Sequence, residues 1–145
     1  MPRILETDWL RAYLEYTKDN ETPEHFHLWS GISCLSSVLR KQVWLQNGPI
    51  PFYPNTYIVL IAPPGTAPKT TAIRYTEKLL IQIEEMVWGP DAVTQEQLIE
   101  IMLRNGTLED SSMTIHSHEF SSLIQPSGIK MMSFLTDIYD NPPRS

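Results

Sequence analysis

The chain has 145 residues, 41% of them hydrophobic, a formal net charge of −6 and a single cysteine, Cys34. This length and hydrophobic content fit one folded domain and exclude wholesale disorder. The acidic balance excludes an overall basic footprint for nucleic acid, and one cysteine excludes an intramolecular disulfide framework. No apolar run approaches the roughly 20 residues of a membrane span, and the first residues lack a signal core. We therefore expect a cytoplasmic protein.

Two helices are predicted in the first third of the chain. Thr7 or Asp8 can cap a first helix that runs to about Asp19. A second helix starts at residues 22–24, Thr-Pro-Glu, which are a cap, a proline at the first helical position and an acid near the positive end. Small residues along this helix, Gly31 among them, permit the close approach of another backbone.

The middle of the chain is predicted to contain strands. Residues 43–45, Val-Trp-Leu, are a short strand candidate, and the proline-rich residues 46–55 are interpreted as a connector. The apolar, β-branched residues 57–61 predict a fully buried strand. A helix is expected from Thr70 to about Met86.

The last third is predicted to be mostly helical. Thr94 and Gln97 form the pattern of a capping box at the start of a short helix. Residues 112–118 are a second strand candidate, and residues 120–124 suggest a helical turn. A last amphipathic helix is expected over residues 129–139. One of its sides should carry Met132, Leu135 and Tyr139.

A candidate phosphate-binding loop joins the predicted strand at 57–61 to the helix that follows. Strand, Pro/Gly turn, Lys-Thr and helix is the order of such a loop, in which backbone N–H groups and the helix N-terminus meet the phosphates. Lys69 would contact the β- and γ-phosphates of ATP, and Thr70 would ligate Mg²⁺. The predicted nucleotide-binding residues are Pro64, Gly65, Thr66, Ala67, Lys69, Thr70 and Thr71.

The loop departs from the standard spacing G-x-x-x-x-G-K-[ST]. Ala62 takes the place of the first glycine, Pro68 replaces the glycine before the lysine, and the loop is one residue longer. Because proline has no N–H, one donor of the cradle is missing. The alternative interpretation is a plain Pro-Gly turn with a solvated Lys69.

Glu119 is the second candidate catalytic residue, beside Lys69. ATP hydrolysis requires a group that orients the attacking water, and Glu119 follows the strand candidate at 112–118. The residue before it is His118, where an acid is usual, and a neutral histidine is a poor partner for Mg²⁺.

Several stretches together resemble one family of proteins. They are residues 26–33 (FHLWSGIS), 43–45 (VWL), 53–65 (YPNTYIVLIAPPG), 69–71 (KTT) and 117–120 (SHEF). Over most of residues 8–140 the chain looks like the N-terminal part of phage and prophage P-loop ATPases, which are replicative-helicase-like proteins of largely unknown function. A long A-P-P-G loop is normal in that family, whereas Pro68 remains a departure.

The resemblance implies an α/β fold in which N-terminal helices (residues 1–45) precede a partial RecA-like or AAA-like three-layer core (residues 46–145), truncated at its C-terminus. It also implies ATP and Mg²⁺ as cofactors and a role in DNA replication. DNA would be reached through an oligomeric assembly, such as a homo-oligomer, or through a missing C-terminal region. We expect hydrolysis by this chain alone to be poor, because a sensor strand and an arginine finger are not identified.

Two other functions stay open from the sequence. The first is a non-catalytic interaction domain that keeps the fold with a degenerate phosphate loop, as Pro68 and His118 would suggest. The second is a metal-dependent hydrolase, since His116 and His118 alternate on a predicted strand and could share a Zn²⁺ ion.

Overall fold

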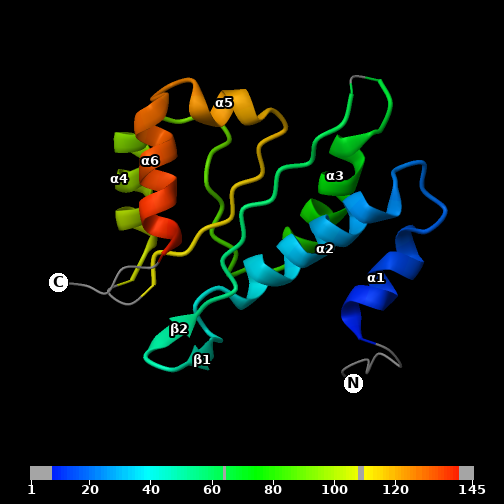
Figure 1. Cartoon of the computed structure of the whole chain (residues 1–145), viewed down its shortest axis with the longest axis horizontal. Coiled ribbons are helices and arrows are strands. Elements are labelled where there is room, and N and C mark those ends of the chain that lie inside the picture. Colours follow the sequence, from blue (N-terminus) through cyan, green and yellow to red (C-terminus); the bar gives the residue numbers. More distant parts are fainter. Residues whose placement is uncertain (1–7, 64, 108–109, 141–145) are drawn as a thin grey trace. The chain divides into compact units, whose positions relative to one another are not determined.

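The computed structural model describes residues 8–63, 65–107 and 110–140. Over these residues the protein is mixed α/β, with six helices and one two-stranded antiparallel sheet (Figure 1). In chain order the elements are α1 Trp9–Thr17, α2 Glu24–Leu39, β1 Leu45–Asn47, β2 Ile50–Phe52, α3 Lys69–Leu80, α4 Gln95–Asn105, α5 Phe120–Ile124 and α6 Ile129–Tyr139. Within the described ranges, no helix has the length and apolar character needed to cross a membrane.

The chain divides into two compact units, which are discontinuous in sequence. The first contains the residues up to Leu39 together with Thr56–Glu84, and therefore holds α1, α2, α3 and the candidate phosphate loop. The second contains Arg40–Asn55 and the residues from Glu85 onward, and therefore holds the β1–β2 hairpin, α4, α5 and α6.

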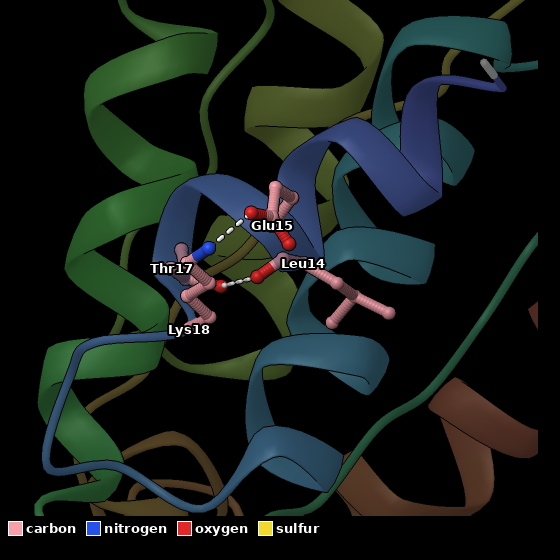
Figure 2. A network of polar contacts seen from close by, with 4 residues as sticks. All are labelled: Leu14, Glu15, Thr17 and Lys18. Atoms are coloured by element: carbon pink, nitrogen blue, oxygen red, sulfur yellow. Dashed lines mark hydrogen bonds and ion pairs between the residues drawn. The ribbon is translucent and has the colours of Figure 1, made fainter.

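Side chains make hydrogen bonds to the backbone at both ends of helix α1. The Asp8 carboxylate accepts a hydrogen bond from the backbone N–H of Arg11 at 3.0 Å, which confirms Asp8 as the N-cap. At the other end the Thr17 hydroxyl donates to the carbonyl oxygen of Leu14 at 3.3 Å, and Lys18 pairs with Glu15 (Figure 2). The predicted end near Asp19 is therefore close to the observed one.

Helix α2 packs against both α1 and α3 in the first unit. Its most buried face carries small and polar residues (Ser30, Gly31, Cys34) beside Phe26 and His27. A Cβ atom on Gly31 would lie 2.9 Å from side-chain atoms of Leu10 and Tyr13. The expectation of close approach at this helix is thus confirmed, and α1 is the element that approaches.

A buried polar cluster lies inside this unit. The Tyr13 hydroxyl is 3.4 Å from Nδ1 of His27, and the ring of Tyr75 meets the His27 ring edge-on with centroids 5.6 Å apart. Nε2 of His27 is buried and has no hydrogen-bond partner among the described residues. Burial lowers the pKa of His27 and raises that of Cys34 to about 11.

The predicted buried strand at 57–61 is wrong. The segment forms no ladder with the described residues, and it leads into α3 as an extended stretch (Figure 1). Tyr57, Val59 and Ile61 are exposed while the two residues between them are half-buried, as expected when one face of an extended segment is covered. An apolar run indicates a buried strand only if neighbouring strands pair with it. The described chain supplies none.

Residues 46–55, predicted as a connector, instead contain most of a β-hairpin. Leu45 pairs with Phe52 and Asn47 with Ile50 in antiparallel register, and Gly48 takes a φ of 59° in the turn. Prolines fit β2 because both strands of a two-stranded sheet are edges. The helix after the loop is also shorter than predicted, since α3 ends at Leu80.

The second unit has its core between α4, α5 and α6. The capping box at α4 is confirmed: the Thr94 hydroxyl accepts from the N–H of Gln97 at 3.3 Å and the Gln97 side chain accepts from the N–H of Thr94. The core residues are Val93, Leu98 and Met131, with Ile101, Met102, Met113, Ile115, Ile124, Phe134 and Leu135 packed around them.

Helix α6 has the predicted bounds but not the predicted face. Met131 is fully buried, whereas Met132 and Tyr139 are exposed. The residues of α6 that pack into the core are Met131, Phe134 and Leu135, so Leu135 is the one member of the predicted set that does so.

The strand predicted at 112–118 is reduced to one parallel bridge between Trp88 and Thr114. Two hydrogen bonds hold it, from the N–H of Gly89 to the carbonyl of Thr114 at 2.8 Å and from the N–H of Thr114 to Val87 at 2.9 Å. The flanking residues pack into the helical core and do not extend the ladder.

Candidate functional site

The candidate phosphate loop runs from Ala62 to the first turn of α3. The N–H and the hydroxyl of Thr66 both donate to the carbonyl oxygen of Pro63, at 3.3 and 2.8 Å. Gly65 has a φ of 74°, a left-handed conformation that favours glycine, and nothing would meet a Cβ atom there. The loop is therefore open to solvent at Gly65, where a ligand could approach the backbone.

Pro68 forms a tight turn directly before α3. Its φ of −77° and ψ of 70° are those of an inverse γ-turn, and the N–H of Lys69 donates to the carbonyl oxygen of Ala67 at 2.9 Å. The departure at Pro68 consequently costs the cradle two donors. Pro68 has no backbone N–H, and the N–H of Lys69 is engaged within the turn.

The ammonium group of Lys69 is held across the loop. Its Nζ donates to the carbonyl oxygen of Ala62 at 3.1 Å, so the half-buried side chain folds back onto the start of the loop. This geometry differs from that of a freely solvated surface lysine. An ammonium group has three donors, so two stay free to meet an anion at the centre of the loop.

Three backbone N–H groups around Lys69 are without hydrogen-bond partners among the described residues. They belong to Gly65, Ala67 and Thr70, and the last of these is in the first turn of α3. Exposed N–H groups at a helix N-terminus, with the partial positive charge of the helix behind them, attract anions. The loop thus combines three backbone donors with one fixed cation.

All but one of the predicted nucleotide-binding residues lie in the described part of the loop and the first turn of α3. Gly65, Thr66, Ala67 and Lys69–Thr71 are all in the first unit, whereas Pro64 lies outside the described residues. The hydroxyl of Thr70 engages no described residue, so it is available as a ligand for a metal ion that a nucleotide brings with it.

Thr22 contributes to this loop, which sequence reasoning missed. Its buried hydroxyl donates to the carbonyl oxygen of Pro68 at 3.1 Å, and α2 begins two residues later at Glu24. Asn20 receives the N–H of Thr22 at 2.9 Å and bonds the hydroxyl of Tyr75 at 3.3 Å. The α1–α2 connection therefore braces the end of the loop. A link across 46 residues leaves no periodic or motif signal in the sequence.

Glu119 belongs to the second unit, whereas Lys69 belongs to the first. It is exposed and directly precedes the short helix α5, and its carboxylate bonds to no described residue. Its backbone carbonyl accepts from the Ser117 hydroxyl at 2.7 Å and from the N–H of Ser122 at 3.0 Å. The side chain is therefore accessible, and the backbone around it is fixed.

The two histidines considered as zinc ligands have different surroundings. The ring of His116 meets Trp88 edge-on, with centroids 5.4 Å apart, while His118 is exposed. Within the described residues, no group of three or more His, Cys, Asp or Glu side chains is arranged to hold a metal ion. These histidines therefore lack further ligands in the described chain.

Comparison with known proteins adds no relative to this description. No protein-family model matches the chain, and no curated protein or solved structure matches it.

Proposed function

We propose that the chain is an ATP-binding module, with the nucleotide phosphates bound at the loop from Ala62 to Thr71 in the presence of Mg²⁺. The observation that carries this proposal is the Lys69 ammonium group, fixed 3.1 Å from the Ala62 carbonyl oxygen in a loop with free N–H groups. A charge fixed in this way needs little reorganisation to meet a phosphate. Thr70 would ligate the Mg²⁺ ion.

The resemblance to phage and prophage P-loop ATPases extends the proposal to a replication protein. In that setting the chain would form part of a three-layer α/β core that is completed by strands from elsewhere in an assembly.

Hydrolysis is the weaker half of the proposal. The Pro68 turn removes two loop donors, and Glu119 has no carboxylate neighbour directly before it in the sequence. A binding module that hydrolyses ATP slowly or not at all is therefore the form we propose. Rapid steady-state turnover by the purified chain, abolished in Lys69→Ala, would contradict this part alone.

A non-catalytic interaction domain is the second candidate function, and the Pro68 turn favours it. Isothermal titration calorimetry with ATP and Mg²⁺ separates the two. The wild-type chain should bind, Lys69→Ala should weaken binding about tenfold or more because a charged hydrogen bond is lost, and Lys78→Ala, an exposed lysine on the same helix, should bind normally. No heat of binding for wild type would favour the interaction domain.

A further inference from the structure

The β1–β2 hairpin is exposed on both of its faces. Every residue of the two strands is exposed, including Phe52 at 53%, and the neighbouring Trp44 is 60% exposed. A two-stranded hairpin with neither face covered is marginal in water, and large exposed apolar side chains mark interaction sites. The question is which partner fits this hairpin.

The two faces of the hairpin carry different chemistry. The register pairs Leu45 with Phe52 and Asn47 with Ile50, so these four residues share one face. Three of the four are large and apolar, and we call this the apolar face. Continuing that register by one residue places Trp44 opposite Tyr53, on the other face. This second face, defined by Trp44, Tyr53 and Lys41, is the aromatic face.

A cation is fixed beside the aromatic face. Nζ of Lys41 lies 5.3 Å from the centroid of the Tyr53 ring, which is a cation–π geometry. Tyr53 thereby positions the ammonium group, while the neighbouring Trp44 ring stays exposed. A fixed cation next to an exposed indole is the pairing that single-stranded nucleic acids use, because bases stack on rings and phosphates meet cations.

The sequence of the hairpin segment carries positive charge only. The chain is acidic overall, with a net charge of −6, yet it has no Asp or Glu between Glu24 and Glu77. Arg40 and Lys41 precede β1 within that stretch. The residues that form the hairpin and its flanks, 40–55, therefore include two cationic side chains and no carboxylate.

The hairpin edge is poorly suited to another strand. Pro51 lies inside β2, and Pro49 and Pro54 flank it, so three backbone N–H groups are missing along this strand. Proline at an edge disfavours the addition of a strand. This argues against strand exchange with a second copy as the main use of the hairpin.

We propose that the aromatic face of the β1–β2 hairpin binds single-stranded nucleic acid, with a base stacked on Trp44 and a phosphate bound by Lys41. The site shares no residue with the ATP loop, so the proposal stands without nucleotide binding. It also gives the chain its own contact to nucleic acid, which need not come from another subunit.

Fluorescence anisotropy of a labelled fifteen-nucleotide oligo(dT), at low salt and without ATP, tests the proposal. Wild type should bind. Trp44→Ala should weaken binding about fivefold or more, and Trp44→Phe should keep most of the affinity because a ring remains. A plot of the logarithm of the association constant against the logarithm of the salt concentration has a negative slope. Lys41→Ala should make this slope less steep by about 0.7, the effect of one phosphate contact on a single strand.

Three matched controls keep the test specific. Trp29→Ala removes another exposed tryptophan, on α2, Phe52→Ala removes the ring on the apolar face, and Lys130→Ala removes an exposed lysine of α6. All three should bind like wild type, with circular dichroism confirming that each variant is folded. Oligo(U) in parallel tells RNA from DNA, and binding of either supports the proposal.

Several results would overturn it. They are no binding by wild type at about 100 µM protein and low salt, equal losses in Trp29→Ala and Trp44→Ala, or duplex DNA bound as tightly as single strands, because stacking needs unpaired bases. A dimer in sedimentation that Trp44→Ala dissolves, with no oligonucleotide binding, would assign the face to a second copy instead.

Discussion

The hydroxyl of Thr22 donates to the carbonyl oxygen of Pro68 at 3.1 Å, joining the start of the α2 region to the last loop residue before α3. The same carbonyl accepts the N–H of Thr71 at 3.0 Å. The shape of the loop therefore depends on a residue far from it in sequence, and the placement of Lys69 depends on that shape.

Replacing Thr22 with valine tests this bracing. Thr22→Val keeps the side-chain volume but removes the donor, and Pro68 keeps its bond from Thr71, so we expect the free energy of unfolding to fall by about 1 kcal/mol. Urea denaturation measures it. Thr136→Val, which removes an exposed hydroxyl bonded to the Met132 carbonyl, should change stability less. Equal losses in both variants would argue against a special role for Thr22.

The Pro68 turn should limit affinity for the nucleotide. Pro68→Gly restores a backbone N–H at position 68 and releases the N–H of Lys69 from the γ-turn. We therefore expect this variant to bind ATP a few-fold more tightly than wild type. Calorimetry measures the change, and Pro54→Gly, outside the loop, is the control. Unchanged or weaker binding in Pro68→Gly would mean that the turn helps to shape the site.

The buried His27 should make stability depend on pH. Burial lowers its pKa below the ordinary value of about 6.5, so between these two values the unfolded chain binds more protons than the folded one. Stability should thus be complete above about pH 7 and fall as the pH drops below about 6.5. The nearby Tyr13 and Cys34 both have raised pKa values and do not titrate in this window.

Urea denaturation between pH 7 and pH 5 measures this dependence. His27→Gln should be less stable at pH 7 but should lose much of the pH dependence, since the titrating group is gone. His25→Gln, which alters an exposed histidine two residues away, should keep the wild-type slope. The explanation would be rejected if His27→Gln retained that slope as well.

The contact between α1 and α2 should tolerate no side chain at Gly31. Gly31→Ala gains about 1 kcal/mol of helix propensity, but its Cβ would meet Leu10 and Tyr13 at 2.9 Å. Because Tyr13 is buried and stacked on Trp9, it has little room to move, and overpacking costs about 1–3 kcal/mol. We expect a net loss of stability on thermal denaturation, whereas Ser33→Ala on the same helix should cause none.

Signals that act over a few residues predicted the structure well. The caps at Asp8 and Thr94 and the bounds of α6 follow from hydrogen bonds and periodicities within one or two turns. The strands did not follow in this way, because whether residues 57–61 or 112–118 form a ladder depends on partners far away in the sequence. The connector at 46–55 was misjudged for a related reason, since its prolines exclude a central strand but not an edge.

The candidate site shows the same division. The order Gly65, Lys69, Thr70 was readable from spacing, and so was the missing donor at Pro68. The fold-back of Lys69 onto Ala62 and the brace from Thr22 were not readable, because each depends on the path of the loop in space.

The most direct test of nucleotide binding at Lys69 is a calorimetric series with adenosine, ADP and ATP, each with Mg²⁺, on wild type and Lys69→Ala. If the loop holds phosphates, wild-type affinity rises from adenosine to ADP to ATP, and Lys69→Ala removes most of that rise. Equal affinity for adenosine and ATP, or an unchanged series in Lys69→Ala, would contradict phosphate binding at this loop.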